Sequence, residues 1–222
     1  MSTILLLIRR LRFFLIPYGL FLACAGIFLS FYSKKEIHLF LNKFYSPVWD
    51  FLMPWITWIG NGWLITAVIF LLFAWNRRFA FFTGVAVVSA SIITYILKQT
   101  IYYGEPRPKY VFSGDPEFRI VPGFEQQMHL YDTFPSGHTT GAFALFVCLA
   151  IAVHNKWLRL LCFVLAILAG SSRIYLSQHF LPDVYGGSLI GTLVPLLIIG
   201  AAIHKGWLPV TSDPTKAWHL EK

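Results

Sequence analysis

Charged residues are scarce in this sequence. They make up 13% of its 222 residues, about half of the roughly 25% that is usual in soluble domains. Hydrophobic residues make up 57% of the chain, and its mean hydropathy is +0.64. A soluble domain needs more charge to cover its surface, and disordered, collagen-like and coiled-coil chains have other compositions. These shortages exclude those classes and predict an integral-membrane protein.

Cysteine is also rare, and its positions form no recognisable pattern. Cys24, Cys148 and Cys162 each lie inside an apolar stretch. This excludes both a disulfide framework and a CxxC metal site. We expect the three side chains to pack as small hydrophobic groups.

The net charge of +8 arises from 18 basic and 10 acidic residues. The basic residues are scattered singly between apolar runs, whereas a nucleic-acid-binding protein gathers them on one face. We therefore expect no nucleic-acid partner. In a membrane protein, basic residues more naturally set the topology.

Six apolar stretches approach the length of about 20 residues that a membrane-spanning helix needs. They cover residues 13–32, 58–75, 79–97, 139–154, 160–174 and 185–203. We predict an all-α fold, a bundle of six transmembrane helices that forms a single domain over residues 1–222. The mixed stretch 34–55 is interpreted as an amphipathic segment at the membrane interface. The apolar run STILLLI is too short to span and precedes its arginines, so no cleavable signal peptide is expected.

Basic residues favour one orientation of this bundle. With a cytoplasmic N-terminus, ten of the eighteen basic residues lie on the cytoplasmic side and eight of the ten acids lie outside. The ten are Arg9, Arg10, Arg12, Arg77, Arg78, Lys156, Arg159, Lys205, Lys216 and Lys222. The positive-inside rule then predicts a multi-pass protein of the cytoplasmic (inner) membrane with both termini in the cytoplasm.

Only one connection is long, over residues 99–134, and it is rich in Pro, Gly, Tyr and charge. Four polar segments lie at its ends or on the same outer side: Lys98, GEPRP (104–108), FPSGH (134–138) and SSRIYLSQHFLPD (171–183). Ionisable groups near membrane depth are costly, which makes them functional candidates. We expect these segments to form one site facing the periplasm or the cell exterior.

The cations of this cluster predict a site for an anion. Lys98, Arg107 and Arg173 supply positive charge, and Ser136 and Gly137 stand where a helix is expected to begin. Free N–H groups at a helix N-terminus bind anions, and the planar guanidinium of arginine suits phosphate oxygens. The expected ligand is a phosphate group.

Two histidines in the cluster can perform phosphoryl transfer. One of His138 and His179 can attack phosphorus while the other protonates the leaving oxygen. Asp183 follows His179 by four residues and can accept the N–H of its imidazole. His38 and His129 are interpreted as structural and solvated residues, respectively, although His129 is placed to touch a head group.

Three segments of this chain resemble the signature of the type 2 phosphatidic acid phosphatase superfamily, which reads K-x6-RP, PSGH and SR-x5-H-x3-D. They are KQTIYYGEPRP, PSGH and SRIYLSQHFLPD. The second and third parts match in full. In the first part, eight residues instead of six separate Lys98 from Arg107. We expect a loop containing Gly104 and Pro106 to absorb the difference.

This resemblance implies a role for each residue. His179 is expected to form a phosphohistidine, Asp183 to orient it, and His138 to protonate the leaving oxygen and then activate water. Phosphate is expected to be held by Lys98, Arg107, Ser136, Gly137 and Arg173. The resemblance implies no metal and no other cofactor. Within the family, the chain is similar to the integral-membrane branch.

Three other interpretations of the cluster are less favoured. A Ser136–His138 pair is two residues apart, and such side chains do not face each other on a helix. A metal site formed by Asp183 and the two histidines is unfavourable, because the three neighbouring cations would repel a divalent ion. A non-hydrolytic phospholipid binder or translocator needs no paired histidines with an orienting Asp.

We therefore predict a lipid phosphatase whose partners are a phosphorylated lipid and the membrane. A lipid A phosphate and undecaprenyl diphosphate are the favoured substrates, followed by phosphatidylglycerol phosphate and phosphatidate. The sequence leaves open the choice among these lipids and the oligomeric state.

Overall fold

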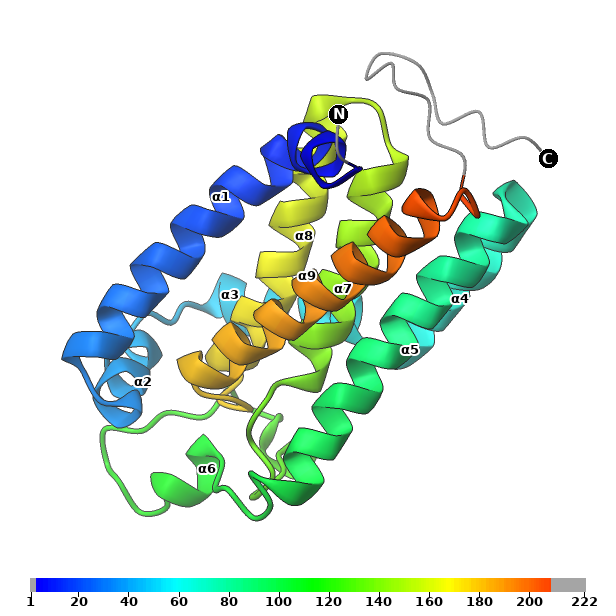
Figure 1. Cartoon of the computed structure of the whole chain (residues 1–222). Helices are drawn as coiled ribbons and strands as arrows, with labels where there is room; N and C mark the ends of the chain where they lie inside the picture. Colours follow the sequence, from blue (N-terminus) through cyan, green and yellow to red (C-terminus); the bar gives the residue numbers. More distant parts are fainter. Residues whose placement is uncertain (1–2, 209–222) are drawn as a thin grey trace.

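The computed structural model describes residues 3–208, which form a bundle of helices with no strand in that range (Figure 1). In chain order the elements are α1 (Thr3–Phe31), α2 (Lys34–Asn42), α3 (Pro47–Ile56), η1 (Thr57–Gly60), α4 (Gly62–Trp75), α5 (Arg77–Thr100), α6 (Pro108–Val111), η2 (Glu125–Gln127), α7 (Gly137–Ala152), α8 (Lys156–Tyr175) and α9 (Leu181–His204). The predicted all-α fold class is confirmed.

Five of the six predicted spans fall on one helix each, and the second falls on η1 and α4, which Asn61 separates. α1, α5, α8 and α9 are long and apolar enough to cross a membrane. The segments Pro47–Gly60 and Gly62–Trp75 pass the same test together, as a pair bent by 51°. α7 is apolar but has only 16 residues. The count of six transmembrane helices therefore stays a prediction, while four helices of the described chain are long and apolar enough to cross a membrane.

The stretch expected at the interface folds into α2 and α3. A capping box opens α2: the Ser33 side chain accepts from the Glu36 N–H at 3.3 Å, and Glu36 accepts from the Ser33 N–H at 2.8 Å. Ser46 caps α3, and Pro47 occupies its first turn, where its missing N–H costs nothing. These caps explain why a polar, proline-containing stretch forms two short helices.

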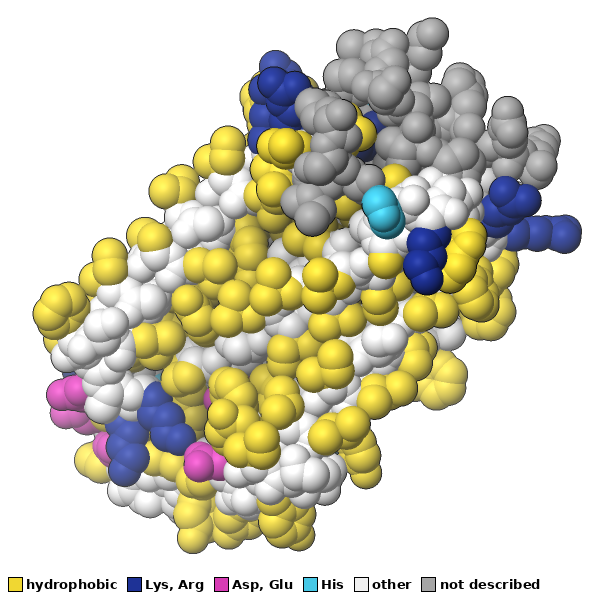
Figure 2. Space-filling view, viewed as in Figure 1, with side chains coloured by type: hydrophobic (Ala, Val, Ile, Leu, Met, Phe, Trp, Pro, Cys, Tyr) yellow, Lys and Arg dark blue, Asp and Glu magenta, His cyan; other side chains and the backbone are white. Residues whose placement is uncertain are grey.

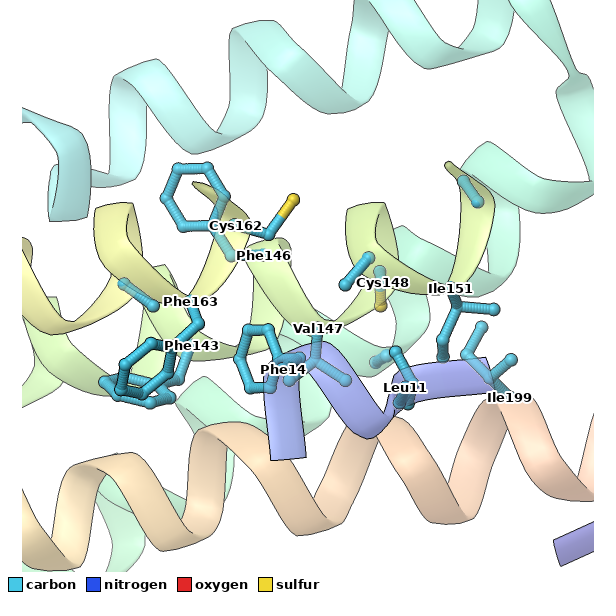
Figure 3. Close-up of a cluster of buried hydrophobic side chains, with 14 of the residues drawn as sticks. Leu11, Phe14, Phe143, Phe146, Val147, Cys148, Ile151, Cys162, Phe163 and Ile199 are labelled. Carbon is cyan, nitrogen blue, oxygen red and sulfur yellow. The ribbon is translucent and has the colours of Figure 1, made fainter. Parts of the chain in front are cut away.

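α7 lies at the centre of the bundle and packs against α5, α8 and α9. Thirteen of its sixteen residues are buried. Figure 3 shows Phe14 of α1 beside Phe143 of α7 and Phe163 of α8. Cys148 and Cys162 pack in this cluster as predicted, whereas Cys24 is exposed on α1. A helix enclosed by other helices explains how so short an apolar segment is stable.

Two glycines let α9 approach α7 closely. A Cβ atom built on Gly187 would lie 2.7 Å from the backbone oxygen of Ser136. One at Gly191 would collide with the backbone oxygen of Thr140. Small residues four apart allow helix backbones to pack closely in membranes. This contact fixes the start of α7 against the first half of α9.

The two ends of the bundle differ in charge. Figure 2 shows an apolar middle, Lys and Arg at both ends, and Asp and Glu only at the end that carries α2 and α6. The start of α1 and the end of α9 lie together at the opposite end (Figure 1). Lys216 and Lys222, which were assigned to the cytoplasmic side, lie outside the described residues.

Candidate active site

His179 and Asp183 form a buried pair at the junction of α8 and α9. The loop of residues 176–180, called here the His179 loop, joins the two helices. His179 Nδ1 lies 3.3 Å from Asp183 Oδ2, and each residue is only 2% exposed. The same carboxylate oxygen accepts from the Phe180 N–H at 2.8 Å and from the Thr133 hydroxyl. Asp183 therefore holds the imidazole by Nδ1, and this contact leaves Nε2 for chemistry.

The surroundings of His179 keep its imidazole neutral. Burial lowers its pKa well below the usual value, and Arg107, Arg173, Lys98 and His138 lower it further. A neutral imidazole that donates from Nδ1 carries its lone pair on Nε2. This is the protonation state that a histidine nucleophile requires.

Lys98 and Arg107 meet at one backbone oxygen. Lys98 Nζ donates to the Asp132 carbonyl at 2.8 Å, and Arg107 Nη2 donates to the same oxygen at 3.2 Å. α5 ends at Thr100, and Gly104 adopts φ of +75°, so the chain between the two cations is largely a loop. The expected loop is present, and it brings the lysine back to the arginine despite the longer spacing.

Arg107 also joins the long connection to the His179 loop. Its Nε donates to the Tyr131 carbonyl at 2.7 Å, and its Nη1 lies 3.3 Å from both the backbone and the side-chain oxygen of Gln178. Burial lowers the pKa of Arg107, while Asp183 and Asp132 oppose this shift. The guanidinium stays charged at neutral pH.

Arg173 lies in the last turn of α8 and is 7% exposed. Its Nη1 donates to Thr57 Oγ1 at 2.7 Å. In the part of the chain that the structure describes, its Nε and Gln178 Nε2 are buried donors without a hydrogen-bond partner. Within residues 3–208, none of Lys98, Arg107 and Arg173 forms an ion pair with a carboxylate. Positive charge and unpaired donors together make a site for an anion.

The PSGH segment forms the N-terminus of α7. The buried Ser136 is its N-cap and accepts from the Thr139 N–H at 3.4 Å and the Thr139 hydroxyl at 2.9 Å. Its own N–H donates to the Asp183 carbonyl at 3.0 Å, which ties this helix start to α9. A Cβ on Gly137 would meet nothing within 4 Å. There is therefore space beside Gly137, and the first N–H groups of α7 have no acceptor in the preceding turn of the helix.

Two cavities meet at His138. A cavity of about 370 Å³, called here the polar cavity after its lining by His138, Arg173, Gln178, Thr57, Asn61, Gln127 and His129, is also lined by Pro54, Trp55, Trp58 and Phe124. A second, mainly apolar cavity of about 490 Å³ lies between α4, α5 and the start of α7, and His138 also lines it. A polar head and an apolar tail on one ligand match this pair of spaces.

All eight predicted site residues therefore lie at one end of the bundle, although they come from four parts of the chain. Within residues 3–208, no group of three His, Cys, Asp or Glu residues is placed to hold a metal ion. Sequence reasoning missed Thr133, Thr57 and Gln178. Thr133 directly precedes the FPSGH segment, but Thr57 and Gln178 carry no signal in a single sequence.

The fold is similar to two solved membrane proteins. LpxE of Aquifex aeolicus matches with a TM-score of 0.63 and 23% identity, over 74% of this chain and 93% of that protein. A PAP2-type phosphatidylglycerolphosphate phosphatase of Bacillus subtilis matches with a TM-score of 0.64 and 21% identity, over 85% of this chain and 96% of that protein. At these identities the likeness concerns the fold.

Curated relatives match in sequence as well. Undecaprenyl-diphosphatase BcrC of Bacillus subtilis is 29% identical, over 70% of this chain and 74% of its own length. A lipid A 4'-phosphatase of Bacteroides thetaiotaomicron is 23% identical, over 70% and 71%. Both are named as phosphatases, in agreement with the enzyme class that the sequence predicts.

A family model matches residues 79–205, which is more than half of the chain and contains all eight predicted site residues. Its description is the PAP2 superfamily, the family that the three motifs resemble. The chain therefore belongs to the PAP2 superfamily.

Proposed function

We propose that this protein is an integral-membrane lipid phosphatase that hydrolyses a phosphate monoester or a diphosphate without a metal. One observation carries this proposal. Among residues 3–208, three cations that have no carboxylate partner and two buried donors that have no acceptor lie beside the buried His179–Asp183 pair. Such donors stabilise the charge on a transferring phosphoryl group. The histidine pair supplies a nucleophile, which a simple phosphate-binding site does not need.

In the first step, Nε2 of His179 forms a bond to phosphorus. The bond between phosphorus and the lipid oxygen breaks, and its electron pair goes to that oxygen. His138 gives a proton to the oxygen, and the dephosphorylated lipid leaves. Asp183, which contacts Nδ1 at 3.3 Å, stabilises the positive charge that develops on the imidazole.

In the second step, the neutral His138 takes a proton from water, and the water oxygen attacks phosphorus. The bond between nitrogen and phosphorus breaks, its electron pair returns to His179, and phosphate is released. Lys98, Arg107 and Arg173 hold the phosphoryl oxygens throughout both steps, with the amide of Gly137 and the hydroxyl of Ser136.

The two cavities indicate a substrate that is part polar and part apolar. The polar cavity of about 370 Å³ extends beyond Arg173 to Asn61, Gln127 and His129, so it has room for more than one phosphoryl group. The apolar cavity beside His138 suits a lipid chain. We favour a lipid A phosphate or undecaprenyl diphosphate, which are named for two curated relatives, over phosphatidate and over phosphatidylglycerol phosphate, which is named for the Bacillus subtilis structural neighbour.

The charge distribution supports a location as well. The protein is proposed to be a single domain in the cytoplasmic membrane, with the site facing the periplasm or the cell exterior and both termini in the cytoplasm. Arg9, Arg12, Arg77 and Arg78 lie at the end opposite the site, as the positive-inside rule requires of the cytoplasmic side.

The test is phosphate release by the purified protein from a panel of the four lipids. The wild type should release phosphate from at least one of them with EDTA present, and vanadate should block the release. His179→Ala should lower the rate by about 10³-fold or more, because the nucleophile is lost. His204→Ala, which changes an exposed histidine at the far end of α9, is the matched control and should keep the wild-type rate.

Two outcomes would contradict the proposal. Turnover by His179→Ala at the wild-type rate would exclude the nucleophile, and loss of activity in EDTA would favour a metal. The competing function is a phospholipid binder or translocator. It would show phosphate-dependent lipid affinity with no phosphate release by the wild type.

A further inference from the structure

The side chain of His38 is buried between the two loops that build the site. It lies on α2, outside the motifs, and is 1% exposed. Its Nε2 lies 3.1 Å from the Ser177 hydroxyl. Ser177 stands two residues before His179, in the His179 loop. Within the described chain, His38 Nδ1 has no hydrogen-bond partner, so the ring makes this one polar contact.

Ser177 has a backbone conformation that needs support. Its φ of +51° lies in the left-handed region, a backbone conformation that residues other than glycine seldom adopt. Its N–H donates to the Ile174 carbonyl at 2.9 Å, while its hydroxyl contacts His38 and lies 3.5 Å from Asn42 Nδ2. Both side-chain contacts come from α2. The turn that sets the direction of the chain into His179 is therefore held from outside the loop.

Aromatic contacts hold the His38 ring on its other sides. It stacks on Phe112 with a centroid distance of 5.5 Å, and it meets Phe180 edge to face at 5.3 Å. Phe112 belongs to the long connection, and Phe180 directly follows His179. Burial lowers the pKa of His38 to about 4, so the ring is neutral at pH 7. It therefore acts as a hydrogen-bonding and packing group.

The neighbours of His38 on α2 make the same connections. Lys34, one turn before it, pairs with Glu105 of the long connection at 3.2 Å and lies 5.3 Å from the centroid of the Phe180 ring. Asn42, one turn after it, exchanges two hydrogen bonds of 2.8 Å with the backbone of Arg119. Residues four apart lie on one face of a helix. This face of α2 thus contacts the long connection and the His179 loop together.

We propose that His38 is a positioning residue for the reaction, holding the His179 loop through Ser177 so that the nucleophile faces the phosphoryl group. The inference rests on the proposed function. In this proposal α2 does not bind the phosphoryl group, because His38 reaches His179 only through Ser177 and Phe180. A nucleophile displaced by about 1 Å can lose about 10²-fold in rate.

The test compares three variants in phosphate release. His38→Phe keeps a ring among the aromatic side chains but removes the contact to Ser177, and Ser177→Ala removes it from the other partner. Each should lower kcat by about 10- to 100-fold and leave KM within about twofold, because the cations that bind phosphate are untouched. His38→Gln, which keeps a polar group, should recover much of the loss.

The double variant distinguishes positioning from general loss of packing. If both residues act through one contact, His38→Phe with Ser177→Ala should be no slower than the slower single variant. The matched control is His204→Phe, which should keep the wild-type kcat. The melting temperature in detergent, measured for each variant, shows that the compared proteins are folded.

Any one of three results would overturn the inference. The first is a folded His38→Phe with the wild-type kcat, and the second is a double variant in which the kcat losses of the two single variants multiply. The third is a change in KM alone. If His38→Phe does not fold, Ser177→Ala decides alone, and a wild-type kcat in that variant overturns the inference. Equal phosphate release by the wild type and His179→Ala would instead overturn the proposed function. The two failures are therefore distinguishable.

Discussion

Arg173 and Gln178, whose buried donors lack acceptors among the described residues, mark this site most clearly. Arg173 Nε and Gln178 Nε2 are enclosed by the protein yet make no hydrogen bond to any residue that the structure describes. Leaving one such group unpaired costs about 1–3 kcal/mol. A bound phosphoryl group offers the acceptors that both donors lack. An anion bound at the site would thus recover the stability that the free protein gives up.

Replacement of Arg173 by lysine tests this account at the scale of one residue. Arg173→Lys keeps the charge but loses the planar set of donors and the contact to Thr57 at 2.7 Å. Loss of one well-placed donor to a developing oxyanion costs about 10²- to 10³-fold in kcat. The expected loss in phosphate release lies in that range.

Arg78→Lys is the control for charge and should have no effect. Arg78 is exposed and lies at the start of α5, at the end of the bundle opposite the site. If Arg173→Lys kept the wild-type kcat, charge alone would be sufficient at this position. The geometric role of the guanidinium would then be wrong.

Individual residues could be predicted where the chemistry is specific to a residue type. His138, His179, Asp183 and the three cations stand out because ionisable groups are rare in so apolar a chain. Thr133 and His38 could not be found in this way. A threonine that donates to Asp183 and a histidine that contacts Ser177 gain their meaning from loop geometry, and a single sequence does not contain that geometry.

At the scale of elements, the contact between α7 and α9 fixes the site. α7 supplies His138 at its N-terminus and α9 supplies Asp183 in its first turn. The Ser136 N–H bond to the Asp183 carbonyl at 3.0 Å joins the two helix starts directly. Gly187 makes this approach sterically feasible.

Gly187→Ala should therefore disturb both stability and activity. The new Cβ would lie 2.7 Å from the Ser136 carbonyl, a backbone atom that moves only if the start of α7 moves. Overpacking of this kind costs about 1–3 kcal/mol. The melting temperature in detergent should fall, and phosphate release should fall beyond the loss of folded protein.

Gly19→Ala is the matched control, because a Cβ there meets nothing within 4 Å. It lies inside α1, where alanine favours the helix by about 1 kcal/mol. Its melting temperature should stay the same or rise. A fall for Gly19→Ala as large as that for Gly187→Ala would contradict the packing argument.

Hydrophobic runs predicted the long helices well, since α1, α5, α8 and α9 each contain an apolar window long enough to cross a membrane. Their ends were less predictable. α1 is described from Thr3, and it runs through Arg9, Arg10 and Arg12 into the predicted first span. The second predicted span is broken at Asn61, whose side chain caps α4, and the segments on either side of this residue are bent by 51°. Capping by a single side chain is a local effect that hydropathy does not register.

At the scale of the whole molecule, the fold places a charged pocket at one end of an apolar bundle. Figure 2 shows the apolar surface that separates this end from the other. His138 lines both the polar cavity of about 370 Å³ and the apolar cavity of about 490 Å³. A lipid in the membrane can thus present its phosphate to the histidines while its chain stays among apolar side chains.

The most direct test of the central claim is to trap the reaction intermediate on the whole protein in vesicles. The wild type is mixed with a lipid labelled in its phosphate, quenched in base to preserve a phosphohistidine, and digested so that the labelled residue is identified. We predict label on His179 and none in the His179→Ala variant. Label on another residue, or phosphate release at full rate with no labelled protein at any time, would contradict the account.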